Sequence, residues 1–97
     1  MPTRARLSRQ AGIDLADIWT FGAAKWSVMQ ADRYEDGLHA AIDLLAANPR
    51  MAPERGPIAG IRIHVYRAHL IVYAEARDGI TVLRVLHGRS DWRMVLV

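Results

Sequence analysis

The sequence predicts an α+β fold of two layers, in which a helical hairpin packs on a mainly antiparallel four-stranded sheet in the order β-α-α-β-β-β. Three observations support this fold. Apolar runs at residues 61–66, 69–76 and 80–87 are separated by short links, two segments of helical periodicity precede them, and a short alternating segment comes first. With 97 residues, the chain is expected to form a single domain over residues 1–97.

The first strand is expected at residues 3–7. Ala5 and Leu7 alternate there with polar residues, so they fall on one face of a strand. A segment this short is expected to join one edge of the sheet.

The first helix is expected to begin after Ser8, which is a candidate N-cap. Its apolar face repeats at helical spacing and includes two tryptophans that we expect in the core: Leu15, Ile18, Trp19, Gly22 and Trp26. The opposite face is polar: Asp14, Asp17, Thr20 and Lys25. The helix is therefore amphipathic and is expected to rest on the sheet or on the second helix.

The second helix is expected to begin after Ser27, because Ser27 and Gln30 have the spacing of a capping box. Its apolar face repeats at the same helical spacing: Ala31, Tyr34, Leu38, Ala41, Ile42 and Leu45. The helix is expected to end at Asn48-Pro49, since Pro49 cannot continue the helical hydrogen bonds. The two helices then form an antiparallel hairpin with almost no linker.

Two tight links pair the last three strands into an antiparallel meander. Arg67-Ala68 is a two-residue link, and Asp78-Gly79 is a pair that favours a tight hairpin turn. Strict alternation along residues 80–87 would place Arg84 on one face of the last strand and His87 on the other.

Arg84 interrupts an otherwise apolar strand, so its charge needs a partner. An ion pair with Glu75 on the neighbouring strand would satisfy it. The alternative is that Arg84 contacts an anion or a partner protein on an uncovered face of the sheet.

The composition excludes several kinds of site. The chain has no cysteine and no pair of histidines at the i,i+4 spacing, so neither a metal nor another cofactor is expected. No run approaches the roughly 20 apolar residues that span a bilayer, and residues 1–10 lack the apolar core of a signal peptide, so a cytoplasmic location is expected. The net charge is +3 and every basic residue except Lys25 is an arginine, which suits an acidic protein or nucleic acid partner as well as an ordinary solvated surface.

Short stretches over nearly the whole chain carry a family resemblance: Leu7-Ser8, Asp14-Leu15-Ala16-Asp17-Ile18-Trp19, Trp26, Gln30-Ala31, Tyr34, Leu45-Ala46-Ala47-Asn48-Pro49, Gly60-Ile61-Arg62, Ile71-Val72-Tyr73, Gly79-Ile80 and Leu83-Arg84-Val85-Leu86-His87. In this order and spacing they resemble the ParE branch of the RelE/ParE toxin superfamily of bacterial type II toxin–antitoxin modules. The resemblance implies a toxin that poisons DNA gyrase and blocks replication. It also implies a ParD-like antitoxin that holds the toxin inactive in a heterotetramer or larger complex, with no membrane partner and no sequence-specific DNA binding without the antitoxin.

The other branch of this superfamily consists of RelE-like nucleases that cleave mRNA on the ribosome. Metal-free RNA cleavage needs a base, cations and an acid at one point. RelE-like nucleases that resemble this chain carry a Tyr-Arg pair at the start of the third strand, an Arg after the last strand, and a Tyr or His near the C-terminus. Leu70 stands at the first Arg position, Arg89 fills the second, and residues 93–97 contain no Tyr or His. The sequence therefore favours a binding protein over an enzyme, and we assign no catalytic residue.

Two other functions stay open. One is a ribosome-dependent mRNA interferase that uses Arg62, Arg84, Arg89 and His87, and the other is a non-toxic scaffold that only binds the antitoxin. For the binding function, we expect partner contacts from arginines of the sheet and from the polar exit of the last strand: Arg62, Arg67, Arg84, Arg89, Trp92 and Arg93.

Overall fold

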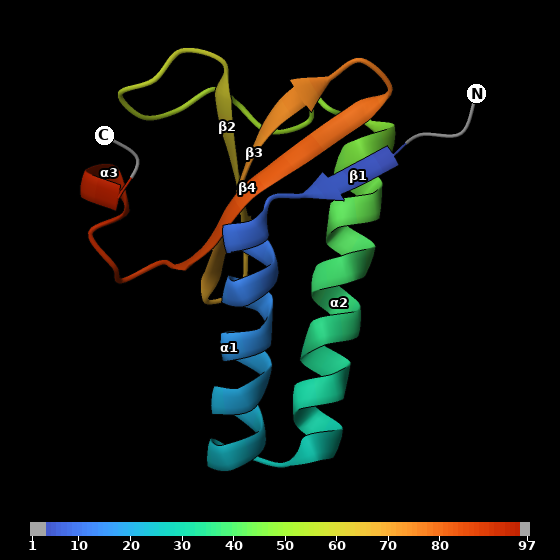
Figure 1. The fold of residues 1–97 in the computed structure, drawn as a ribbon, viewed down its shortest axis with the longest axis vertical. Coiled ribbons are helices and arrows are strands. Elements are labelled where there is room, and N and C mark those ends of the chain that lie inside the picture. Colours follow the sequence, from blue (N-terminus) through green and yellow to red (C-terminus); the bar gives the residue numbers. More distant parts are fainter. Residues whose placement is uncertain (1–3, 96–97) are drawn as a thin grey trace.

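The computed structural model describes residues 4–95, which form a sheet and a helical hairpin (Figure 1). The elements are, in chain order, β1 (Arg4–Leu7), α1 (Arg9–Lys25), α2 (Val28–Ala47), β2 (Ile61–Tyr66), β3 (His69–Ala76), β4 (Gly79–His87) and α3 (Trp92–Val95). This order confirms the predicted β-α-α-β-β-β arrangement and adds the short helix α3. The far halves of α1 and α2 extend beyond the sheet, so the tip of the hairpin projects from the body of the molecule (Figure 1).

The sheet has the order β1-β4-β3-β2. The pairs β2–β3 and β3–β4 are antiparallel, and β1 runs parallel to β4 at the edge. The predicted meander and the predicted edge position of the first strand are both confirmed. Residue 3, where that strand was expected to start, lies outside the described residues.

Gly79 allows β1 to approach β4 closely. A Cβ atom at Gly79 would overlap the carbonyl oxygen of Arg4, and Gly79 has a φ of 156°. The N–H of Arg4 donates to the carbonyl of Asp78 at 2.8 Å, beside this contact. β1 can therefore approach β4 this closely only because residue 79 is a glycine and has no side chain.

We expect Gly79→Ala to lower the free energy of unfolding by about 2 kcal/mol or more, because the added Cβ pushes the backbone of Arg4 away. Gly60→Ala is the matched control, since Gly60 also has a positive φ, of 85°, but no atom lies within 4 Å of its Cβ position. Urea unfolding measures both. Equal losses in the two variants would show that only the backbone angle matters.

Both predicted N-caps are confirmed. The hydroxyl of Ser8 accepts from the N–H of Ala11 at 3.0 Å, and the hydroxyl of Ser27 accepts from the N–H of Gln30 at 3.0 Å. Asn48 caps the C-terminus of α2, as expected. Among the described residues, no helix is long and apolar enough to cross a membrane.

A β-bulge interrupts β4. Tyr73 pairs with Val82 but Val72 pairs with Arg84, so Leu83 is the extra residue between them. The strict alternation predicted for residues 80–87 is therefore wrong beyond Val82. Val82 and Val85 both reach the core beneath the helices, although an odd spacing would put them on opposite faces of a regular strand.

The main core lies between the helices and the sheet. Its buried members come from every layer: Ala11, Leu15, Leu38, Ile42, Leu45, Ala46, Ala52, Ile71, Tyr73, Ile80, Val82 and Val85. A second cluster lies on the opposite face of the sheet and is partly covered by Trp92: Ile63, Leu70, Val72 and Leu86.

Trp19 of α1 and Trp26, which directly follows α1, depart from their predicted core positions. Trp19 is half-buried, and its indole N–H donates to Asp32 at 2.8 Å. Trp26 is 65% exposed. The helix ends at Lys25 and the backbone turns at Trp26 (φ −115°, ψ −86°), so Trp26 no longer follows the apolar face. The core prediction for Trp26 is wrong.

Candidate functional site

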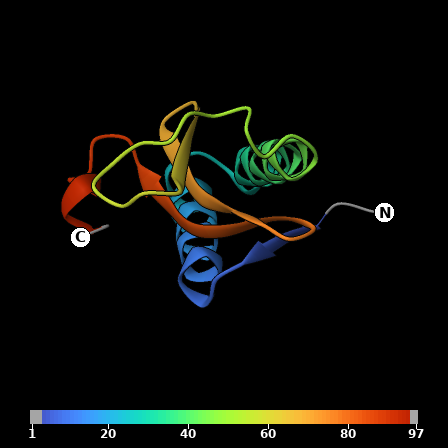
Figure 2. The same ribbon diagram turned by 90° about the horizontal axis from the view of Figure 1, so that it is seen from above.

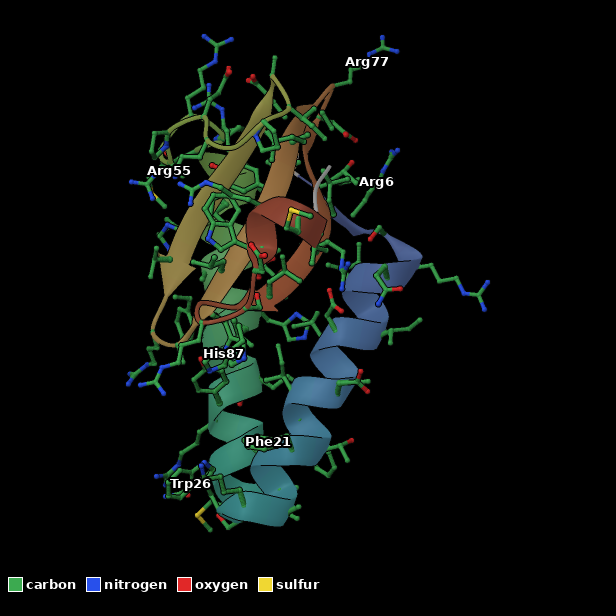
Figure 3. All side chains as sticks on the ribbon, turned by 90° about the vertical axis from the view of Figure 1, so that its left-hand side faces the viewer. Arg6, Phe21, Trp26, Arg55, Arg77 and His87 are labelled. Carbon is green, nitrogen blue, oxygen red and sulfur yellow. The ribbon has the colours of Figure 1, made fainter. Side chains whose placement is uncertain are left out.

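A groove of about 1010 Å³ runs along the helical hairpin and reaches the β2–β3 turn and the end of β4. We call it the hairpin groove. Its aromatic lining comes from both helices and from β2: Phe21, Trp26, Tyr34 and Tyr66. Figure 3 shows His87, Phe21 and Trp26 along the same side of the molecule. Its volume and its aromatic lining make the groove the first candidate for partner binding.

The charges of the hairpin groove have a basic surplus. Lys25, Arg33 and Arg67 line it, together with Asp14 and Asp17. Asp14 is already neutralised by an ion pair with Arg84. The remaining charges favour an anionic partner.

Exposed apolar side chains crowd the tip of the hairpin, where the groove begins. Phe21 and Trp26 are each 65% exposed, and the ammonium of Lys25 lies 5.5 Å and 5.2 Å from their ring centroids. Val28 and Met29 are also exposed. Large apolar side chains gathered at one exposed place typically mark an interaction surface, and the flanking cation adds the composition of an interface anchor.

Tyr34, His69 and His87 form a contact chain across the middle of the groove. The hydroxyl of Tyr34 lies 2.6 Å from Nδ1 of His69, and the rings of His69 and His87 are 5.4 Å apart. Burial raises the pKa of Tyr34. Burial and, to a lesser degree, His87 lower the pKa of His69. Both shifts favour the neutral forms, so a neutral Tyr34 and a neutral His69 share this hydrogen bond, and the tautomer of His69 sets which of the two is the donor.

The depressed pKa of His69 predicts a pH dependence of stability. The unfolded chain takes up this proton near pH 6.5, whereas the folded chain resists it, so the free energy of unfolding falls as the pH drops below about 6.5. Urea unfolding between pH 7.5 and 5 measures the slope. His69→Phe is expected to flatten it, whereas His39→Gln, at an exposed position on α2, is expected to keep it. An unchanged slope in His69→Phe would contradict this assignment.

Arg84 is bound to α1 rather than to β3. Its guanidinium donates to Asp14 at 2.8 Å and 3.1 Å, and the backbone N–H of Val85 donates to the same carboxylate at 2.9 Å. The predicted ion pair with Glu75 is wrong, because Glu75 pairs with Arg50 at 3.4 Å. Asp14 lies on the predicted polar face of its helix, and the structure buries it against β4.

Asp14 is held ionised by its partners. Burial opposes its charge, but the hydrogen bonds from Arg84, Val85 and Gln10 outweigh burial and lower its pKa. The same pair raises the pKa of Arg84. Arg84 is thus engaged within the fold.

Three other predicted site residues, all arginines, lie in different segments of the chain. Arg62 is tied to the 52–54 loop, since it donates to the carbonyl of Ala52 at 2.6 Å and lies 3.7 Å from Glu54. Arg67 is exposed in the β2–β3 turn and lines the hairpin groove. Arg89 is exposed beside the groove, and its backbone N–H donates to Nδ1 of His87 at 3.0 Å.

Trp92 and Arg93 begin α3 on the other face of the sheet. Trp92 is half-buried and packs on the second apolar cluster, and the guanidinium of Arg93 lies 4.5 Å from its ring centroid. These two residues therefore do not line the hairpin groove with Arg67.

The residues considered for RNA cleavage contact different elements. Arg62 binds the 52–54 loop and Arg84 binds α1, whereas His87 lies beside His69. Leu70 is buried in the second apolar cluster. Within residues 4–95, no group of three or more His, Cys, Asp or Glu side chains could hold a metal ion.

The sequence did not predict the contacts of His69 with Tyr34 and with His87. Tyr34 followed the apolar periodicity of its helix, and His69 and His87 looked like separate polar residues of strands. The β-bulge places His69 opposite His87, and no pattern in the sequence indicates that register.

Comparison with known proteins gives consistent matches over most of the chain. A family model described as the ParE toxin of a type II toxin-antitoxin system, parDE, matches residues 5–92. The chain is 41% identical over 91 residues to Toxin ParE1 of Caulobacter vibrioides, covering 91% of this chain and 92% of that toxin. It is 39% identical over 93 residues to Toxin ParE1 of Mycobacterium tuberculosis, covering 94% and 95% of the two chains.

Two solved structures share the fold. One, from a chromosomal ParDE toxin–antitoxin system of P. aeruginosa, has a TM-score of 0.75 at 16% identity and covers 89% of this chain and 96% of that chain. The other, from the E. coli DinJ-YafQ toxin-antitoxin complex, has a TM-score of 0.56 at 17% identity and covers 90% and 93%. At such low identity these likenesses concern the fold alone.

Proposed function

This chain belongs to the ParE toxins of type II toxin–antitoxin systems, and we propose that it arrests bacterial growth in the cytoplasm by binding and poisoning DNA gyrase. In this proposal a ParD-like antitoxin keeps it inactive in a heterotetramer or larger complex. The observation that carries the proposal is the match to the toxin family over residues 5–92, which include the helical hairpin and all of the sheet except Arg4.

The hairpin groove is the proposed binding surface. Its exposed aromatic residues offer anchors, and Lys25, Arg33 and Arg67 offer contacts for carboxylates. A disordered acidic segment that folds as it binds suits such a groove, because its apolar residues bury the aromatic rings while its carboxylates meet the cations. Arg89 and Arg93 are exposed and serve as further partner contacts in this proposal.

We propose that the toxin acts by binding and not by catalysis. Arg62 and Arg84 are engaged with other parts of the fold, and the buried Leu70 occupies the place of a phosphate-binding arginine. These contacts support a site without the converging cations that cleavage of a phosphodiester requires.

One observation favours the second candidate function, cleavage of mRNA on the ribosome. His69 and His87 are in contact within the groove that Arg33 and Arg67 line. Two imidazoles beside cations have the elements of acid–base catalysis on a phosphate. If this function holds, His69→Ala or His87→Ala abolishes cleavage, whereas His39→Ala leaves it unchanged.

Expression in bacteria tests the proposal and separates its alternatives. Induction of this chain alone is expected to stop growth, produce filaments and switch on the DNA-damage response, and coexpression of the adjacent reading frame is expected to relieve all three. Growth arrest with cleaved transcripts and no DNA-damage response would favour the interferase. Growth without arrest, with a stable complex between the two products, would favour the non-toxic scaffold.

A further inference from the structure

The outer side of β1 is an open edge of the sheet. β1 pairs with β4 on one side only, and it stands at the end of the strand order. Seen from above, no other described element lies alongside the outer side of β1 (Figure 2). An open edge presents backbone groups that can pair with another chain.

The ladder with β4 determines which groups of β1 point outward. The N–H of Arg4 donates to Asp78 at 2.8 Å, and the N–H of Ser8 donates to Val82 at 2.9 Å. Since the backbone groups of a strand alternate in direction, the N–H and C=O groups of Ala5 and Leu7 face away from β4. Leu7 is also exposed through its side chain.

The opposite edge of the sheet is closed along the first half of β2. Glu54 bridges to Arg62, the N–H of Ile63 donates to Pro53 at 3.4 Å, and the N–H of Arg55 donates to Ile61 at 2.9 Å. The loop before β2 thus covers the first half of its own strand, and β1 has no such cover within the described residues.

The open edge is strongly basic. Arg4 and Arg6 have side chains that are 65% and 62% exposed, and they share the single carboxylate of Asp78 at 4.0 Å and 3.7 Å. Arg77, in the adjoining β3–β4 turn, projects on the same side of the molecule as Arg6 (Figure 3). The positive charge of this edge therefore favours binding of a strand that carries acidic side chains.

We infer that the outer edge of β1 binds an extended acidic segment of the antitoxin, which adds to the sheet as a further strand beside Ala5 and Leu7. Backbone hydrogen bonds would supply the register, and carboxylates of the segment would pair with Arg4 and Arg6. A second copy of this chain is a poor occupant, because pairing two β1 edges would bring their arginines together. The inference rests on the proposed antitoxin partnership and adds a contact outside the hairpin groove.

Amide hydrogen exchange tests the backbone pairing without any substitution. The probe is the product of the reading frame adjacent to the gene of this chain, mixed with the full chain. The amides of Ala5 and Leu7 are expected to exchange rapidly in the free chain and at least about tenfold more slowly in the complex. The amide of Arg6, which faces β4, is expected to be protected in both states and serves as the internal control.

Reversing the charge of Arg6 tests whether this edge binds the antitoxin through its arginines. Arg6→Glu is expected to weaken binding of the same antitoxin by about tenfold. Arg55→Glu is the matched control, since Arg55 is exposed in the loop before β2 and away from β1, and its affinity is expected to stay unchanged. In the Arg6→Glu chain, slow hydrogen exchange of the amide of residue 6 would verify that β1 still pairs with β4.

The outcomes separate this inference from the proposed function. A tight complex in which the Ala5 and Leu7 amides still exchange rapidly overturns the inference and leaves the proposed function standing. No complex with the antitoxin overturns both. The Ala5 and Leu7 amides could also exchange slowly in the chain alone, and more slowly as its concentration rises. That result identifies a second copy as the occupant and overturns the antitoxin assignment.

Discussion

Replacing Asp14 by Ala is expected to lower the free energy of unfolding by about 3–5 kcal/mol. Asp14 accepts hydrogen bonds from the guanidinium of Arg84 and from the backbone N–H of Val85, beside the β-bulge. Removing the carboxylate leaves a half-buried cation and a buried N–H without their partner, and each unsatisfied group carries a desolvation penalty. Urea unfolding, followed by circular dichroism, measures the loss.

Asp17→Ala is the matched control for this prediction, because Asp17 lies on the same helix but is exposed. We expect it to change stability by less than about 0.5 kcal/mol. A loss in Asp14→Ala no larger than that in Asp17→Ala would mean that the contact between α1 and β4 contributes little to the fold.

The lowered pKa of Asp14 predicts the direction in which stability changes with pH. The unfolded chain protonates this carboxyl near pH 4, whereas the folded chain holds it ionised to lower pH. The stabilisation is therefore fully present above about pH 4 and is lost as the pH falls through the folded pKa. The difference in unfolding free energy between the wild type and Asp14→Asn is expected to narrow below pH 4.

Changing Trp26 to Asp is expected to weaken antitoxin binding by about 100-fold or more and to abolish growth arrest. Trp26 is the most exposed aromatic anchor at the tip together with Phe21, and it lines the groove beside Lys25. The substitution removes the ring surface that the partner is expected to bury in the complex. It also places a carboxylate where an acidic partner is expected. Titration calorimetry with the antitoxin and a growth assay measure the two effects.

Met94→Asp is the control for Trp26→Asp, because Met94 is similarly exposed but lies on α3 and outside the groove. Both variants are expected to keep wild-type stability, since neither side chain belongs to a core cluster. Equal binding by the two variants would place the partner surface elsewhere.

Local signals in the sequence predict much of the fold. Ser8 and Ser27 cap their helices because a hydroxyl can reach a backbone N–H three residues on, and this depends on no distant contact. The tight links around Arg67 and Gly79 likewise determine the order of the antiparallel strands. Elements whose causes lie within a few residues were therefore predictable.

The site was less predictable because a single bulge shifts it. The tight turn before Gly79 alone would place His69 opposite Leu86, but the extra residue Leu83 moves the register by one and brings His87 to His69. The same bulge aims the N–H of Val85 and the side chain of Arg84 at Asp14. Nothing in the alternation of residues 80–87 reveals this extra residue, so the partners of Arg84 and His69 could not be read from the pattern.

The most direct test of the proposed function is a DNA cleavage assay with purified gyrase, supercoiled plasmid and this chain. We expect the chain to increase gyrase-dependent double-strand breaks, the antitoxin to prevent them, and Trp26→Asp to abolish them. The chain is also expected to leave ribosome-bound mRNA intact. Unbroken plasmid together with mRNA cut on the ribosome, and loss of that cutting in His87→Ala, would contradict the account.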